Sequence, residues 1–244
     1  MILFYSEECD GQTARLVGSE ASHCVQALRR QIGDEVYVTD GLGQCFKGEI
    51  TAASKKSVDI TITEEIILKS PRNYHIHIGI APTKNNSRFE WFLEKATEFG
   101  IDEITPLKCA RSERKLVKPD RLSKIILSAM KQSLKTKLPV LNPMVQFQDF
   151  VSGQNHDQMY IAHLEEKPEL LIHKYKSGKN ATILIGPEGD FTSGEINLAT
   201  SKGAKAVSLG DYRLRTETAG IAAVQLIHFV NQAGANSEKG KSNQ

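Results

Sequence analysis

Two glycine-containing stretches in the last third of the chain are suited to holding a ligand through backbone groups. The first, "LIGPEGDFTSGEI", runs from Leu184 to Ile196, and the second, "LGDYRLRTETAG", runs from Leu209 to Gly220. Each follows an apolar run that predicts a strand, and ligands of open parallel sheets bind beyond the carboxyl ends of the strands. Glycine lacks Cβ, so backbone N–H and C=O groups of such loops approach a ligand closely. The stretches therefore predict a site for a planar, polar ligand, although two strand-to-helix turns would show the same spacing.

Other motifs that would assign a chemistry are missing from the sequence or have a simpler interpretation. The chain has no G-x-x-x-x-G-K-[ST] and no G-x-S-x-G, the signatures of a P-loop and of a serine hydrolase. The stretch "VTDGLGQC", Val38–Cys45, faintly resembles the Asp-x-Gly-x-Gly turn of some cofactor sites, but Asp40-Gly41 and the flanking strands favour a β-hairpin. His75 and His77 share one face of a predicted strand. Without a third ligand at a recognisable spacing, we expect them to pack and we expect no metal site.

Positive charge is concentrated in one segment, although the 244-residue chain has a formal net charge of only +2. Residues 107–137 carry 10 Lys/Arg against 2 Asp/Glu, whereas residues 1–70 carry 7 against 11. A local excess of this kind is typical of a polyanion site, and equally of a well-solvated helical face. For each lysine taken singly, solvated surface is the simpler interpretation.

The sequence favours a protein of the reducing cytoplasm. No apolar run approaches the roughly 20 residues of a membrane helix, so we expect no membrane partner. The start "MILFYSEECD" has neither the basic nor the long apolar region of a signal peptide. The four cysteines are scattered, with no C-x-x-C spacing, and this predicts reduced thiols and a cytoplasmic location.

The glycine stretches belong to an α/β region that follows a smaller β-rich one. Residues 1–70 hold short runs rich in Val, Ile and Thr between turn residues, which predicts a small barrel that ends near Ser70-Pro71. Strands and helices alternate over residues 74–234, which predicts a mostly parallel sheet with helices on both faces. The polar tail, residues 235–244, is expected to be disordered.

Three helix ends carry specific signals. We expect Ser19 to cap a helix over residues 19–30. Gly100 follows an amphipathic run and predicts the end of that helix. Thr192 and Glu195 have the spacing of a capping box, which places a helix start directly after the first glycine stretch.

Taken together, the two glycine stretches resemble the cofactor loops of the RsmE-type ribosomal RNA methyltransferases of the SPOUT superfamily. The segments "LIGPEGDFTSGE" and "SLGDYRLRTETAGIAAV" carry this likeness, and "HCVQALRRQIGDEVYVTDGLG" and "KNNSRFEWFLEKATEFGIDEITPLKCARSER" resemble other parts of the family in order. The resemblance covers nearly the whole chain except the tail. It implies a PUA-like β-barrel followed by a SPOUT domain whose parallel sheet ends in a deep trefoil knot.

The resemblance also implies an activity. The methyl donor would be S-adenosylmethionine, and the acceptor would be N3 of a uridine in small-subunit (16S) ribosomal RNA. A homodimer is implied as well, and the helix over residues 216–230 fits one because it is apolar on nearly every side. Three rivals stay open: methylation of another RNA position such as a ribose 2′-hydroxyl, a non-catalytic RNA-binding assembly factor, and an α/β enzyme for a small molecule.

The resemblance assigns roles to residues of both glycine stretches and of the basic segment. The implied cofactor-binding residues are Leu184, Ile185, Gly186, Glu188, Gly189, Leu209, Gly210, Leu214 and Thr216. The implied RNA-binding residues are Arg29, Arg30, Lys108, Arg111, Arg114, Lys115, Lys118, Arg121 and Lys124, through contacts with phosphates.

Arg215 and Glu217 are the expected catalytic residues. Uracil N3 is a poor nucleophile until it loses its proton, so the enzyme must stabilise the anion or supply a base. Arg215 is predicted to stabilise negative charge on the ring or to bind a phosphate. Glu217 is the weaker candidate for a base or an orienting group, because an acid in a first helical turn also suits the helix dipole.

The sequence departs from the family pattern in two places. The start "MILFY" lacks the family's arginine-aromatic pair, and Asp190 stands where a glycine is common. With the acidic balance of residues 1–70, the first departure lowers the RNA affinity that we expect from the barrel. Asp190 adds a charge beside the first loop, and we expect cofactor binding to survive because a helix start tolerates an acid.

Overall fold

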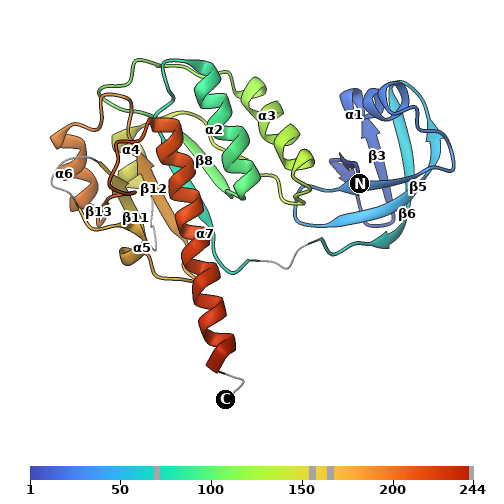
Figure 1. The fold of residues 1–244 in the computed structure, drawn as a ribbon. Helices are drawn as coiled ribbons and strands as arrows, with labels where there is room; N and C mark the ends of the chain where they lie inside the picture. Colours follow the sequence, from blue (N-terminus) through green and yellow to red (C-terminus); the bar gives the residue numbers. More distant parts are fainter. Residues whose placement is uncertain (69–71, 154–157, 164–167, 242–244) are drawn as a thin grey trace. The chain divides into compact units, whose positions relative to one another are not determined.

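A computed structural model describes residues 1–68, 72–153, 158–163 and 168–241, with side chains through residue 234 (Figure 1). The chain divides into two compact units. The N-terminal unit comprises Met1–Pro71 and Ile126–Leu138, and the C-terminal unit comprises Arg72–Ile125 and Pro139–Gln244. The segment 126–138 thus belongs to the N-terminal unit. The domain limits expected from the sequence, residues 1–70, do not include this segment.

The N-terminal unit contains a curled six-stranded sheet that forms half a barrel (Figure 1). The strand order is β1-β4-β5-β6-β3-β2, and every pair is antiparallel except β1 with β4. Side chains alternate between the two faces of a strand, so Leu16, Ile50 and Ile60 fill the inner side. The strands are β1 (Leu3–Tyr5), β2 (Glu8–Cys9), β3 (Thr13–Val17), β4 (Glu35–Thr39), β5 (Cys45–Ala53) and β6 (Ser57–Glu65).

The predicted hairpin at Asp40-Gly41 is confirmed. It joins β4 to β5, which are antiparallel. Asp40 Oδ1 accepts hydrogen bonds from the backbone N–H groups of Leu42 at 2.8 Å and Gln44 at 3.1 Å. Gly41 has a φ of 73°, a left-handed conformation that favours glycine. The local bonds and the glycine together fix the turn.

The prediction of a regular helix capped by Ser19 was wrong. Helix α1 (Gly18–Ser22) starts one residue earlier, and its cap position, Val17, makes no side-chain hydrogen bond. The helix then widens into a π-helical turn, η1 (His23–Ala27). It ends before Arg29, which has a left-handed φ of 54°. The segment packs Ala21 and Cys24 into the core of the unit, and tertiary packing thereby overrides the local cap signal.

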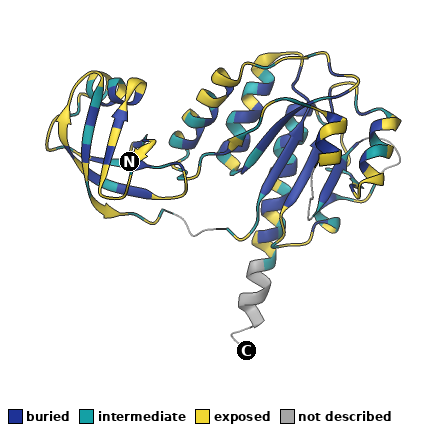
Figure 2. Cartoon of the chain, turned by 180° about the vertical axis from the view of Figure 1, so that it is seen from behind, coloured by how far each residue is buried: buried dark blue, intermediate teal, exposed yellow. Residues whose placement is uncertain are grey.

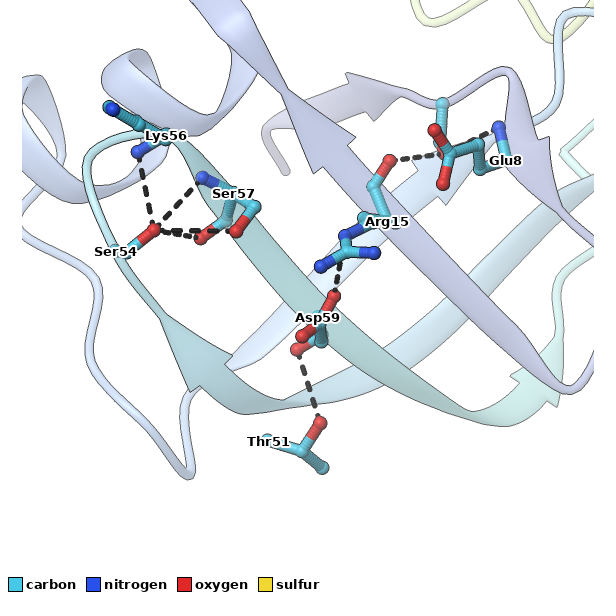
Figure 3. A network of polar contacts seen from close by, with 8 residues as sticks. Glu8, Arg15, Thr51, Ser54, Lys56, Ser57 and Asp59 are labelled. Carbon is cyan, nitrogen blue, oxygen red and sulfur yellow. Dashed lines mark hydrogen bonds and ion pairs between the residues drawn. The ribbon is translucent and has the colours of Figure 1, made fainter.

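The outer face of the half-barrel carries polar contacts among its own residues (Figure 3). Arg15 on β3 forms an ion pair with Asp59 on β6, with 3.1 Å between Nε and Oδ1. The Thr51 hydroxyl donates to the Asp59 carbonyl at 3.3 Å. Ser54 Oγ accepts from the backbone N–H of Ser57 at 3.0 Å and closes the turn between β5 and β6. These contacts engage the Arg15 guanidinium within the sheet.

The C-terminal unit is built on a parallel sheet, which confirms the predicted layer. Its strand order is β10-β8-β7-β12-β11-β13, with β9 beside β8, and all pairs are parallel. The strands are β7 (Ile76–Ile80), β8 (Glu103–Lys108), β9 (Val140–Leu141), β10 (Val145–Gln146), β11 (Met159–Ala162), β12 (Ala181–Ile185) and β13 (Lys205–Val207). The helices are α2 (Asn86–Phe99), α3 (Pro119–Gln132), α4 (Phe147–Gly153), α5 (Leu171–Lys174), α6 (Ser193–Ser201) and α7 (Thr216–Lys241).

Helices cover both faces of this sheet, and its central strands are buried throughout (Figure 2). A Cβ added at Gly79 would lie 3.1 Å from Phe150 of α4, so this side chain position faces α4. The next residue, Ile80, faces the opposite side, where it approaches Gly220 of α7. Gly220 lets α7 pack closely, because a Cβ there would lie 2.5 Å from the Phe92 ring.

Two helix-end predictions are confirmed. Gly100 is the C-cap of α2 with a φ of 95°, and its N–H bonds to the carbonyl of Ala96. Thr192 and Glu195 form the capping box of α6, with each side chain bonded to the other residue's backbone N–H. Glu195 is 5% exposed and also accepts from the backbone N–H of Ala110 at 2.8 Å.

Helix α7 is longer than the predicted helix over residues 216–230, since it extends to Lys241. It therefore enters the tail, residues 235–244, for which we expect disorder. Side chains from residue 235 and the whole of 242–244 lie outside the described residues, so disorder of the tail stays a prediction. Within the described residues, none of the helices has both the length and the apolar character that crossing a membrane requires.

Candidate functional site

A cavity of about 280 Å³ lies at the carboxyl ends of three neighbouring strands of the parallel sheet. β11 pairs with both β12 and β13, and Ala162 is level with Ile185 and Val207. The two glycine stretches leave β12 and β13 at this edge. Their first loop residues, Gly186 and Ser208, line the cavity. The structure thus brings the two predicted loops to one site.

Most of the predicted cofactor and catalytic residues line this cavity. They are Ile185, Gly186, Glu188, Leu209, Gly210, Leu214, Arg215, Thr216 and Glu217. Two others lie elsewhere. The Leu184 side chain is fully buried in the core beside Phe150 and Phe191, because alternation along β12 turns it away from the face of Ile185. Gly189 lies against the side chain of Arg111, 3.5 Å from an added Cβ.

The first loop is held in a tight turn by its own backbone. A Cβ at Gly186 would lie 3.1 Å from the Phe191 ring, closer than ordinary contact. Asp190 has a left-handed φ of 61°, and its N–H bonds to the Pro187 carbonyl at 2.9 Å. Asp190 Oδ1 accepts from the Phe191 N–H at 2.7 Å. This local bond explains how an aspartate occupies a position that suits glycine.

The second loop is tied to the first at the start of α7. The Thr216 hydroxyl donates to the Gly186 carbonyl at 3.0 Å, and Thr216 is 5% exposed. The next residue, Glu217, is buried in the first turn of α7, and its carboxylate lies 3.7 Å from Arg88 Nε. The carboxylate of Glu188 accepts from the Lys84 N–H at 2.9 Å. Two carboxylates therefore face the cavity from fixed positions.

Arg215 is exposed on the cavity wall. No hydrogen bond or ion pair of its guanidinium is recorded among the described residues. Tyr212 also lines the mouth, and it is 86% exposed. An unpaired guanidinium attracts an anion, and an exposed aromatic ring offers a stacking face. The mouth therefore suits an anionic, aromatic acceptor such as a nucleotide.

The predicted RNA-binding residues fall into two groups. Some cations bind other parts of the protein. Arg111 Nη1 donates to the carbonyls of Gly189 at 2.8 Å and Phe191 at 3.2 Å. Arg114 Nε donates to the Thr83 carbonyl at 2.9 Å.

Two further predicted cations, on other elements, are also paired. Arg121 pairs with Glu90, 2.6 Å between Nε and Oε1, and Arg30 lies 3.9 Å from Asp34. The remaining predicted residues have no recorded pairing among the described residues; they are Arg29, Lys108, Lys115, Lys118 and Lys124. Arg111 and Arg114 thus brace the neighbouring loops, whereas the lysines are available to an external anion.

His163 follows β11 and lines the cavity, and it was not among the residues predicted from the sequence. It is 9% exposed, and both ring nitrogens lack a hydrogen-bond partner in the part of the chain that the structure describes. The only signal in the sequence is its place directly after the run "QMYIA". A polar residue at a strand's carboxyl end is a candidate ligand contact. Arg88 was missed as well, since it comes from α2.

Two other chemistries find no support in the described residues. No group of three His, Cys, Asp or Glu side chains there is placed to hold a metal ion. His77 instead bonds to the Thr105 hydroxyl at 2.8 Å. Burial raises the pKa of the Cys109 thiol, and the Glu195 carboxylate raises it further. The thiol is also only 5% exposed, and burial with a raised pKa is typical of a structural cysteine and not of a reactive one.

The cavity fits the expected cofactor in its chemistry. Apolar side chains of Ile185, Val207 and Leu209 offer a surface to a planar base. The carboxylates of Glu188 and Glu217 favour a cationic group. The unpartnered imidazole of His163 provides a site for a hydrogen bond to a bound molecule. S-adenosylmethionine combines a purine, a ribose and a sulfonium cation, so the residues present match the group.

Comparison with known families gives matches to both units. Residues 70–228 match the family described as RNA methyltransferase domain, and residues 16–63 match the RNA methyltransferase PUA domain. The chain is 28% identical to "Ribosomal RNA small subunit methyltransferase E" of Rickettsia conorii, over 94% of this chain and 95% of the relative. It is 31% identical to the Synechocystis protein of the same name, over 88% of this chain and 73% of that one.

Solved structures agree with these matches. A probable rRNA-methyltransferase from Porphyromonas gingivalis superposes with a TM-score of 0.88 at 38% identity, covering 96% of this chain and 99% of that one. The ribosomal RNA small subunit methyltransferase E from Neisseria gonorrhoeae, bound to S-adenosyl methionine, gives a TM-score of 0.83 at 25% identity, over 94% and 98% of the two chains.

Proposed function

Since the chain belongs to the RNA methyltransferase family, whose members include the ribosomal RNA small subunit methyltransferases E, we propose that it methylates a uridine of small-subunit (16S) ribosomal RNA at N3 with S-adenosylmethionine as donor. One observation carries the proposal. The Thr216–Gly186 hydrogen bond joins the two family loops around one cavity, and the exposed Arg215 lines that cavity without pairing to any described residue.

The chain's own residues have three tasks in this reaction. The bound cofactor supplies an electrophilic methyl group on a sulfonium. The buried carboxylate of Glu217 and the exposed carboxylate of Glu188 both line the cavity and favour that positive charge. Arg215 stabilises the uracil anion that remains when N3 loses its proton. The N3 proton would pass to solvent or to Glu217 first. The N3–carbon bond would then form as the carbon–sulfur bond breaks, with S-adenosylhomocysteine as the leaving group.

Tyr212 is expected to stack on the target uracil or on a neighbouring base. Its ring is 86% exposed at the mouth of the cavity, and stacking on an aromatic side chain is worth about 1–3 kcal/mol per base. We predict that Tyr212→Ala raises the KM for RNA about tenfold and leaves the Kd for S-adenosylhomocysteine unchanged. Tyr212→Phe keeps the ring and should behave as wild type. A tenfold rise in both variants would assign the effect to the hydroxyl instead.

The exposed lysines of the basic segment are expected to contact phosphates. We predict that replacing Lys115 and Lys118 by Gln lowers RNA affinity and reduces the salt slope of log Kd by about 1.4–1.8, because each lost phosphate contact removes about 0.7–0.9. Fluorescence anisotropy of a labelled small-subunit RNA fragment at several salt concentrations measures the slope. The matched control is the double variant Lys55→Gln/Lys56→Gln. Both lysines are exposed in a turn of the N-terminal unit. An equal loss of slope in the control would remove the assignment to this segment.

Finer features of the family are part of the proposal. They are the trefoil knot around the two loops, a homodimer, a cytoplasmic location, and ribosomal RNA as the partner. The exposed Phe229 of α7 and Trp91 of α2 support the homodimer, because these helices pack together and present large apolar side chains. The RNA methyltransferase PUA match supports RNA contacts from the N-terminal unit, including Arg29 and Arg30.

The direct test is methyl transfer to small ribosomal subunits from cells that lack this gene. With radiolabelled S-adenosylmethionine, we expect label in ribosomal RNA that digests to 3-methyluridine. Label in a 2′-O-methyl nucleotide would assign the ribose position instead. If S-adenosylmethionine leaves the RNA affinity unchanged and no methyl group is transferred to subunits or to free RNA, the protein would be a non-catalytic assembly factor.

A further inference from the structure

The imidazole of His163 is buried on the cavity wall without a protein partner. It is 9% exposed, and neither ring nitrogen has a hydrogen bond within the described part of the chain. It is also the only side chain among those residues with buried polar atoms in this condition. Buried polar groups in proteins are nearly always hydrogen-bonded, so an exception calls for a physical reason.

Other buried histidines of the C-terminal unit are satisfied by the protein. His77 is 3% exposed and bonds to the Thr105 hydroxyl at 2.8 Å. His228 is 6% exposed, with Tyr74 Oη 2.7 Å from Nδ1 and Arg72 Nη1 3.2 Å from Nε2. The fold therefore provides partners for imidazoles that it buries inside. His163 differs in facing the cavity, so its partner is a molecule that enters the cavity.

The position of His163 indicates which part of that molecule it meets. Ala162 is level with Ile185 and Val207, so the next residue along, His163, lies beside the starts of both glycine loops. The neighbouring walls here are apolar. The charged groups that line the cavity come from the loops beyond this edge and from α2 and α7. The floor around His163 thus suits an uncharged, partly apolar portion of a ligand that still carries hydrogen-bonding atoms.

We propose that His163 anchors the adenosine portion of the cofactor through hydrogen bonds to its purine or ribose atoms, an inference that rests on the proposed function. A neutral imidazole carries one donor and one acceptor, and adenosine offers both kinds of partner, whereas the amino-acid end carries charges. His163 belongs to no group of three potential metal ligands among the described residues.

The proposal separates binding from stability. Without ligand, the unpartnered imidazole is unfavourable inside the fold, because its polar atoms have lost water without replacement. An apolar residue of similar size removes that cost. His163→Leu should therefore leave the free protein at least as stable as wild type while it weakens the cofactor, which is the opposite of what a structural histidine does on replacement.

The experiment measures both quantities on the full-length protein. Calorimetry gives the affinities of S-adenosylhomocysteine, 5′-methylthioadenosine and methionine, and urea unfolding of the free protein is followed by the single tryptophan, Trp91. For His163→Leu we expect about tenfold weaker binding of both adenosine compounds, by the same factor, and an unchanged or higher urea midpoint. His163→Gln, which keeps a donor and an acceptor, should recover most of the affinity.

Three results would overturn the assignment. Equal affinities in wild type and His163→Leu would show that the imidazole does not contact the ligand. A lower urea midpoint with unchanged binding would make His163 structural. Weaker binding of S-adenosylhomocysteine alone, with 5′-methylthioadenosine unaffected, would move the contact to the amino-acid portion. A wild-type protein that binds none of these compounds would sink the proposed function as well, so the two failures are distinguishable.

Discussion

Replacing Arg215 by alanine is expected to lower the rate of methyl transfer by about 10²- to 10³-fold while the Kd for S-adenosylhomocysteine stays within twofold of wild type. Removing one preorganised donor from a site of developing negative charge has an effect of that size. Arg215 lines the cavity mouth, and its guanidinium has no hydrogen bond or ion pair with another described residue, so its loss breaks none of these. Single-turnover transfer to small subunits and calorimetry with S-adenosylhomocysteine measure the two quantities. Arg213→Ala removes a second exposed arginine of the same cavity wall, and a much smaller loss of rate in that variant would show that the effect is specific to Arg215.

The pH dependence of the same variant separates the two roles predicted for Arg215. If the guanidinium stabilises the uracil anion, it lowers the pKa of N3 in the complex. The variant then depends on the small fraction of N3 that ionises unaided, and its rate should rise about tenfold per pH unit above neutrality, more steeply than wild type. If Arg215 instead binds a phosphate, the KM for RNA rises and the pH profiles run parallel.

Features that rest on neighbouring residues could be predicted from the sequence. The capping box of Thr192 and Glu195, the left-handed cap at Gly100 and the turn at Asp40-Gly41 are all present. In each case both partners lie within four residues of one another, so the sequence itself contains the whole interaction. The parallel sheet also followed from the alternation of strands and helices.

Features that depend on distant partners had no such signal. Arg111 was predicted to bind RNA, yet it donates to Gly189, 78 residues away. Composition cannot distinguish an arginine that binds phosphate from one that binds a carbonyl, because both need the same donors. His163 was missed for the related reason that its unsatisfied state appears only when every possible partner has been placed.

The membership of residues 126–138 in the N-terminal unit is a third case. The segment is held there by contacts of long sequence separation. The Thr39 hydroxyl donates to the Thr136 carbonyl at 3.0 Å, and the Leu138 N–H donates to the Gly41 carbonyl at 2.8 Å. Lys131 forms an ion pair with Glu20. The Asp40-Gly41 turn therefore has a structural task that its local sequence does not reveal, since the loop after α3 docks on it.

Replacing Arg72 by methionine is expected to destabilise the C-terminal unit by about 3–5 kcal/mol, because it removes the cation that pairs with a buried carboxylate. Asp102 has a side chain only 4% exposed, and its Oδ1 lies 2.7 Å from Arg72 Nη2. Its Oδ2 accepts from the Ile76 N–H at 2.9 Å, at the start of β7. The guanidinium also lies 3.2 Å from His228 of α7 and stacks 5.1 Å from the Tyr74 ring centre. One side chain thus connects α7 to the sheet.

Urea unfolding followed by Trp91 fluorescence isolates this effect, because the single tryptophan lies on α2 of the C-terminal unit. A double variant tests whether the unpaired charge causes the loss of stability. Asp102→Asn removes the charge that Arg72 compensates, so the double variant Arg72→Met/Asp102→Asn should be more stable than Arg72→Met alone. If the two substitutions simply add, the loss comes from packing on Tyr74 and from the bond to His228, and the buried ion pair is not what stabilises the base of α7.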